Sequence, residues 1–110
     1  GTGNDTLNGN GGNDVIRGGG GTDVITPGAG NDTVVLEVGD GTNTVNGFDT
    51  NPTGGQDRLD VRALGVTAAN FNATVVRTQV GGNTRITIGS VVIILTGVNV
   101  GTISVTDFVV

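Results

Sequence analysis

Residues 9–35 read GNGGNDVIRGGGGTDVITPGAGNDTVV, which is three consecutive nine-residue units, and a shorter unit, GTGNDTLN, precedes them at residues 1–8. Three columns keep the nine-residue interval through all four copies: a glycine, an aspartate and an apolar residue. They are Gly3, Gly12, Gly21 and Gly30; Asp5, Asp14, Asp23 and Asp32; and Leu7, Ile16, Ile25 and Val34. A fifth, weaker copy at 38–46 follows two extra residues and has Asn43 in the aspartate column. Columns fixed in both residue type and interval indicate a repeat architecture.

The glycines allow the positive φ angles of a tight turn, and the aspartate ends that turn. The three residues that follow predict a very short strand whose central apolar side chain points inward. Each repeat then supplies one turn and one strand, so two repeats make a full coil and alternate repeats stack. The spacing therefore predicts an all-β parallel β-roll, in which Asp5 and Asp23 face one gap while Asp14 and Asp32 face another.

Carboxylates that face each other repel, and a cation between them, completed by turn carbonyls, removes that repulsion. A flexible site with six or more oxygen ligands suits Ca²⁺ better than Mg²⁺. The chain has no Cys, His or Lys, which excludes the usual zinc sites, Ser–His or Cys–His catalysis and disulfide partners, so we expect no enzymatic activity. Its net charge of −5 argues against nucleic acid as a partner.

The repeats resemble the RTX (repeats-in-toxin) nonapeptide G-G-x-G-x-D-x-U-x, a calcium-binding parallel β-helix repeat. The resemblance implies several Ca²⁺ ions stacked between turns and held by aspartate side chains and by carbonyls of the turn. The neutral amide of Asn43 makes its site a weaker one. The segment at 48–61 is similar to the end of the RTX roll in serralysin-type metalloproteases, which adds Asp57. The implied metal ligands are Asp5, Asp14, Asp23, Asp32, Asn43, Asp57, Gly1, Gly3, Gly9, Gly11, Gly12, Gly18, Gly19, Gly20, Gly21, Gly28, Gly30, Gly39 and Gly41.

Charge divides the chain near residue 57, because residues 1–57 carry a net −7 and residues 58–110 a net +2. We therefore predict an RTX calcium-binding roll over 1–57 and a C-terminal antiparallel β cap or sandwich over 58–110. Strand candidates in the second half are 73–80, 85–88 and 91–95, separated by glycine turns. The last of these is continuously apolar, which predicts a strand covered on both faces. Single helical turns are expected to start at 67–70 and at 104–107.

The C-terminal region resembles those of bacterial type I secreted proteins, and Asp107-Phe108-Val109-Val110 is similar to the end of their secretion signals. Phe108 to Val110 also suits a last core strand. We expect a domain of a longer protein secreted by a Gram-negative bacterium, monomeric when isolated, with calcium and a type I exporter as partners. It would fold on binding Ca²⁺ outside the cell. The alternatives are a polysaccharide-binding module of a secreted carbohydrate-modifying enzyme and a surface-layer or adhesin segment. Whether Asp40, Asp49 and Asp60 are ligands stays open.

Overall fold

The computed structural model describes residues 3–49 and 56–110, which form short strands and a few single helical turns. The strands are β1 (Thr6–Asn8), β2 (Val15–Arg17), β3 (Val24–Thr26), β4 (Thr33–Val35), β5 (Thr42–Asn46), β6 (Arg58–Asp60), β7 (Val76–Val80), β8 (Asn83–Ile88), β9 (Val91–Thr96) and β10 (Phe108–Val109). The helices are α1 (Phe71–Thr74) and the 3₁₀ turns η1 (Arg62–Leu64), η2 (Val100–Thr102) and η3 (Val105–Asp107). Within these described ranges, no helix combines the length and apolar character that crossing a membrane requires.

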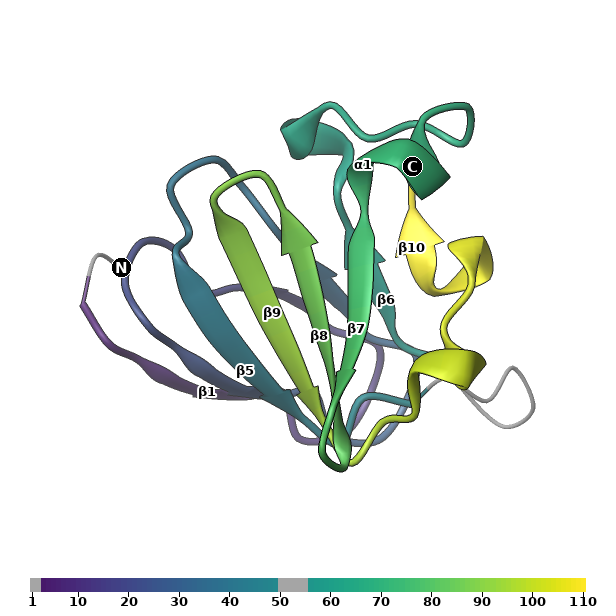
Figure 1. Ribbon diagram of the computed structural model, residues 1–110. Helices are drawn as coiled ribbons and strands as arrows, with labels where there is room; N and C mark the ends of the chain where they lie inside the picture. Colours follow the sequence, from purple (N-terminus) through teal and green to yellow (C-terminus); the bar gives the residue numbers. More distant parts are fainter. Residues whose placement is uncertain (1–2, 50–55) are drawn as a thin grey trace.

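Alternate repeats stack into two sheets, as the nine-residue period predicts (Figure 1). One sheet has the order β1-β3-β5-β9-β8-β7, and the other has the order β10-β6-β4-β2. The repeat strands pair in parallel, with Leu7 opposite Ile25 and Ile16 opposite Val34. The two extra residues before the fifth copy do not break the ladder, because Val45 still lies opposite Ile25. The prediction of an all-β parallel roll is therefore confirmed.

The central apolar residue of each repeat strand points between the two sheets. Ile25, Val34 and Val45 are fully buried, and Ile16 is 9% exposed. Burial of each such side chain stabilises the fold by about 1.5–3 kcal/mol. This is little compared with the conformational entropy that a glycine-rich chain loses on folding. The second half of the chain adds buried apolar contacts to the roll, because the core of the roll is continuous with Leu59, Leu95 and the other buried residues of that half.

The second half contributes an antiparallel meander, β7-β8-β9, as expected. The turn between β8 and β9 has Gly89 at φ +60° with Ser90 outside the left-handed region, which suits a type II′ hairpin. Strand β9 also pairs in parallel with β5 over five residue pairs, from Thr42–Val92 to Asn46–Thr96. One sheet therefore runs through both halves of the chain.

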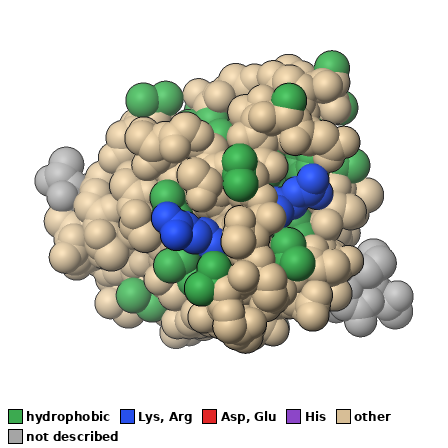
Figure 2. All heavy atoms as spheres, viewed as in Figure 1, with side chains coloured by type: hydrophobic (Ala, Val, Ile, Leu, Met, Phe, Trp, Pro, Cys, Tyr) green, Lys and Arg blue, Asp and Glu red, His purple; other side chains and the backbone are tan. Residues whose placement is uncertain are grey.

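Two expectations for the second half were wrong in detail. The strand expected over 73–80 begins only at Val76, because Phe71–Thr74 form a helical turn. Strand β9 is not covered on both faces: alternate residues are buried, but Val92 and Ile94 are half-buried on the outer side of the sheet. Figure 2 shows that side, where hydrophobic and basic side chains are scattered over the surface.

The C-terminal residues are integrated into the core. Ser104 and Asp107 form a capping box around η3, in which the buried Asp107 accepts a hydrogen bond from the Ser104 N–H at 2.9 Å. Strand β10 then pairs in parallel with β6, placing Phe108 opposite Leu59. The Phe108 ring packs edge-on against Phe71, with 4.8 Å between ring centroids. The helical turn expected at 104–107 is confirmed.

Gly30 and Gly12 offer a matched test of how closely the coils stack. They occupy the same place in two stacked repeats, with φ +110° and +92°. A Cβ added to Gly30 would collide with the Gly12 carbonyl oxygen, whereas one added to Gly12 meets no atom within 4 Å. Both alanine variants incur the left-handed penalty, so we expect Gly30→Ala to lower the free energy of unfolding by about 1–3 kcal/mol more than Gly12→Ala. Urea unfolding in saturating calcium measures the difference, and equal losses would contradict close stacking.

Candidate metal centre

In the six-stranded sheet, a side chain from one turn reaches across the gap to the backbone of the turn stacked on it. The Oδ1 atom of Asp23 accepts a hydrogen bond from the Asp5 N–H at 2.9 Å. The Oδ1 atom of Asn43 accepts one from the Asp23 N–H at 2.8 Å. Asp5, Asp23 and Asn43 therefore form one column, and one side chain of the column crosses each gap. Asp23 and Asn43 are both buried.

The four-stranded sheet has a matching column. The Oδ1 atom of Asp32 accepts a hydrogen bond from the Asp14 N–H at 2.8 Å, and Oδ1 of Asp57 accepts one from the Asp32 N–H at 3.0 Å. Asp57 differs from the others because its second oxygen is also engaged, by the Asp49 N–H at 2.9 Å. Burial raises the pKa of Asp57 despite these bonds, and the charges of Asp32 and Asp49 raise it further.

Three buried carboxylate oxygens in these columns have no hydrogen-bond partner among the described residues: Oδ2 of Asp14, of Asp23 and of Asp32. In Asp23 and Asp32 the other carboxylate oxygen accepts a hydrogen bond within the column, and in Asp14 the backbone N–H donates one. The Oδ2 atom of Asp14 lies 2.8 Å from where a Cβ on Gly9 would be, and Oδ2 of Asp23 contacts the corresponding position on Gly18. A buried, unpartnered carboxylate oxygen is costly unless a cation or a donor approaches it.

The surroundings of these oxygens fit a hard cation with mostly backbone ligands. Carbonyls of one turn lie directly against glycines of the next, and the Gly21 carbonyl oxygen is 2.7 Å from a Cβ built on Gly41. No group of three or more Asp, Glu, His or Cys side chains in residues 3–49 and 56–110 is placed to hold an ion. A carboxylate supplemented by carbonyl oxygens therefore suits Ca²⁺ and does not suit zinc.

Residues 1–34 match the family model for the RTX calcium-binding nonapeptide repeat in four copies. The match covers less than a third of the chain, and the matched family is one of calcium-binding repeats. A search of curated proteins found no match to the chain.

Among solved structures, the chain is similar to the extracellular lipase LipA from Serratia marcescens, with a TM-score of 0.68 and 22% identity. That match covers 100% of this chain but only 20% of the lipase, and at this identity it supports the fold alone. Two subunits of the Azotobacter vinelandii mannuronan C5-epimerase AlgE6 also match at 22% identity. The match to R3 has a TM-score of 0.43 and covers 99% of this chain and 80% of R3. The match to R2 has a TM-score of 0.46 and covers 98% of this chain and 88% of R2.

The predicted ligands of the RTX repeats lie in the stacked turns. Asp5, Asp23 and Asn43 share one column, and Asp14, Asp32 and Asp57 share the other. The predicted glycines in the described turns are Gly3, Gly9, Gly11, Gly12, Gly18, Gly19, Gly20, Gly21, Gly28, Gly30, Gly39 and Gly41. Gly1 lies outside the described residues.

A second polar ladder runs beside each aspartate column and was not assigned from the sequence. The side-chain oxygen of Asn4 accepts a hydrogen bond from the Thr22 N–H at 3.0 Å, and that of Asn13 accepts one from the Asn31 N–H at 2.8 Å. Asn31 continues the second ladder to Gln56 at 2.7 Å. The sequence signal for this ladder was the asparagine that directly precedes the column aspartate in three of the repeats, at positions 4, 13 and 31. These amides fix the spacing of the turns without adding charge.

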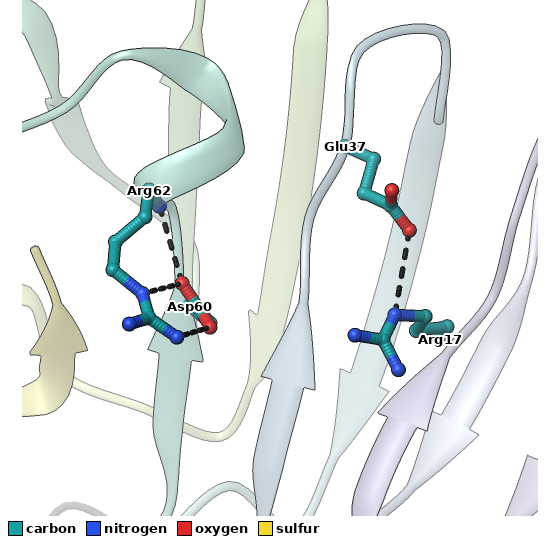
Figure 3. Close-up of polar contacts among 4 residues, drawn as sticks. All are labelled: Arg17, Glu37, Asp60 and Arg62. Carbon is teal, nitrogen blue, oxygen red and sulfur yellow. Dashed lines mark hydrogen bonds and ion pairs between the residues drawn. The ribbon is translucent and has the colours of Figure 1, made fainter.

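Asp60 forms a salt bridge with Arg62, as Figure 3 shows. Its two oxygens accept hydrogen bonds from the Arg62 guanidinium at 3.0 and 2.8 Å. The same figure shows Glu37 directed at Arg17, a looser pair at 3.5 Å between exposed side chains. Arg62 and Arg17 therefore each already pair with a carboxylate that lies outside the columns.

The Asp60 pair predicts a pH-dependent stability difference. Hydrogen bonding to Arg62 holds the pKa of Asp60 below its usual range, so the pair stabilises the fold fully above the unfolded value of about 4 and less as pH falls through the lowered pKa. We expect Asp60→Asn to be less stable than the unmodified chain by a constant amount at pH 5–7. That deficit should shrink toward about pH 3.

Denaturant unfolding at each pH and at fixed calcium measures this difference. Glu37→Gln is the control, since its exposed ion pair should contribute little at any pH. A deficit that widened on acidification would contradict the assignment.

Proposed function

We propose that the chain is a calcium-dependent folding module at the C-terminus of a larger protein secreted by a Gram-negative bacterium through a type I exporter. Residues 1–57 act as the RTX roll, with one Ca²⁺ in each gap between stacked turns. Residues 58–110 act as the β cap, and Asp107–Val110 are the end of the secretion signal. The isolated domain is a monomer. The match of residues 1–34 to RTX repeats supports the calcium-binding part.

The proposal depends above all on the unpartnered oxygens of Asp14, Asp23 and Asp32. Buried carboxylates without a counter-charge lower the stability of the apo fold, and a cation reverses that loss. Residues 1–57 also carry a net −7, so their turns repel one another when no cation is bound. The free energy of calcium binding thereby becomes free energy of folding.

This coupling matches the conditions on the two sides of an exporter. Calcium is scarce inside the cell, so the acidic repeats stay unfolded and can be threaded through a channel. Extracellular modules bind Ca²⁺ at about 10⁻⁴–10⁻³ M, so calcium outside the cell drives folding. The RTX repeats and the fold shared with an extracellular lipase support a secreted protein.

The polysaccharide-binding alternative has less support. Carbohydrate sites commonly use exposed aromatic platforms. The three phenylalanines, Phe48, Phe71 and Phe108, are only 3–5% exposed. A surface-layer or adhesin segment would self-associate with calcium, which light scattering detects.

The test is a calcium titration followed by far-UV circular dichroism, with Asp32→Asn as the key variant. In EDTA we expect a largely disordered roll, and millimolar calcium should restore β-structure where equal magnesium does so poorly. The amide in Asp32→Asn keeps an acceptor for the Asp14 N–H but removes the charged oxygen. We therefore expect the calcium midpoint to rise roughly tenfold or more, with the circular dichroism spectrum in EDTA unchanged.

Glu37→Gln removes one negative charge outside the columns and should leave the midpoint nearly unchanged. An apo chain that is fully ordered and indifferent to calcium would overturn the proposal. A midpoint shifted equally by Asp32→Asn and Glu37→Gln would show that only net charge matters.

The secretion signal is tested by deleting residues 107–110. In the folded state this removes the Asp107 cap and the Phe108 ring, and the loss of Phe108 alone should cost about 3–5 kcal/mol. A chain exported unfolded does not need that packing, so the lost stability should not by itself block export. We expect the deletion to abolish secretion from cells with a type I exporter, measured as protein in the medium against protein retained. Normal export would contradict the signal assignment.

A further inference from the structure

One gap in the aspartate columns lacks a column carboxylate. Asp23, Asp32 and Asp57 each reach across a gap with a charged side chain, but the gap between the turns at 18–23 and 38–43 is crossed by the neutral Asn43. This gap is otherwise built like the rest. The Thr44 N–H donates to the Asp23 carbonyl at 2.9 Å, and the Gly41 and Gly21 backbones are in close contact.

An additional carboxylate lies in the turn that forms this gap. Asp40 precedes Asn43 by three residues and stands where the other copies have Gly11, Gly20 and Ala29. It is only 4% exposed. Its Oδ2 atom accepts a hydrogen bond from the Glu37 N–H at 2.6 Å, and its own N–H donates to the Glu37 carbonyl at 3.2 Å.

The charge on Asp40 has no cation beside it in the described part of the chain, where the ion pairs found are Arg17–Glu37 and Arg62–Asp60 (Figure 3). Its acidic neighbours are instead Glu37 and Asp23, whose charges add to the effect of burial and raise the pKa of Asp40. Asp23 itself has the unpartnered, buried Oδ2 atom in the adjoining turn. Buried charges in proteins are normally paired or bound to metal, so this arrangement favours a cation.

We propose that Asp40 supplies the carboxylate ligand for a Ca²⁺ ion between the turns at 18–23 and 38–43, in place of the aspartate that Asn43 replaces. The inference rests on the proposed calcium function and assigns a ligand to it. The two extra residues before this repeat, Leu36 and Glu37, have a part in this arrangement. The Glu37 N–H holds the Asp40 carboxylate, and the Leu36 N–H donates to the Asp60 carbonyl, so the charge is moved three residues along the turn without breaking the ladder.

The competing role for Asp40 is that of a turn cap alone, and Asp40→Asn separates the two. The amide keeps an acceptor for the Glu37 N–H, so a mere cap would bind calcium as the unmodified chain does. We expect instead that calorimetry of the full chain shows one fewer ion, or one ion bound at least about tenfold more weakly. The circular dichroism spectrum in EDTA should match that of the unmodified chain.

Asn43→Asp in the Asp40→Asn background is the rescue variant. It restores a carboxylate in the column position that Asp23 and Asp32 occupy, and we expect it to recover the lost ion. Glu37→Gln is the matched control, because it removes one charge from an exposed side chain while the backbone N–H that bonds Asp40 is kept. Unchanged calcium binding by Asp40→Asn, or failure of the double variant to recover the ion, overturns the inference. An unmodified chain that binds no calcium would overturn the proposed function itself.

Discussion

Each gap between stacked turns contains one buried side chain that accepts a hydrogen bond from the backbone of the neighbouring turn, and the roll depends on this contact. The repeat strands β1 to β4 have only three residues each and supply few ladder hydrogen bonds. The side-chain bridges at 2.8–3.0 Å add a fixed spacing between coils. Because most bridges are aspartates, the contact that sets the register also brings negative charge into the stack. The bridges that set the register are therefore also the groups proposed to bind calcium.

The second half of the chain meets a different need. A solenoid that buries one side chain per repeat exposes its core at an open end, and terminal elements must cover it. Strands β9 and β6 continue the two parallel ladders, so the cap joins by backbone pairing as well as by apolar packing. Leu59, Leu95 and Phe108 extend the row of Ile25, Val34 and Val45 into one core. Side-chain bridges hold the turns of the coil together, and the cap covers its end.

The nine-residue columns were sufficient to predict the parallel sheets, the stacking of alternate repeats and the inward-facing residues. Such features follow from local spacing that every copy repeats. The parallel pairing of β9 with β5 was not predicted, because an apolar segment such as Val91–Leu95 does not specify which distant strand it will join. The same holds for Asp57: its acidic character was visible, but its bonds to both Asp32 and Asp49 depend on how the chain returns after residue 49. The amide ladder of Asn4, Asn13 and Asn31 was present as a column, and only the structure shows its hydrogen bonds.

The last four residues form a core strand, and the secretion signal proposed for them is compatible with that packing because the two roles belong to different states of the chain. In the folded state Asp107 closes a capping box and Phe108 is 5% exposed against Phe71, so an exporter could not bind either side chain. In the unfolded state both are accessible, and the net charge of −7 on residues 1–57 disfavours the compact state. The parallel pairing of β10 with β6 places the C-terminal strand beside the strand that follows Asp57. The hydrogen bonds of Asp57 and the burial of Phe108 therefore involve adjacent backbone, so ordering of one favours ordering of the other.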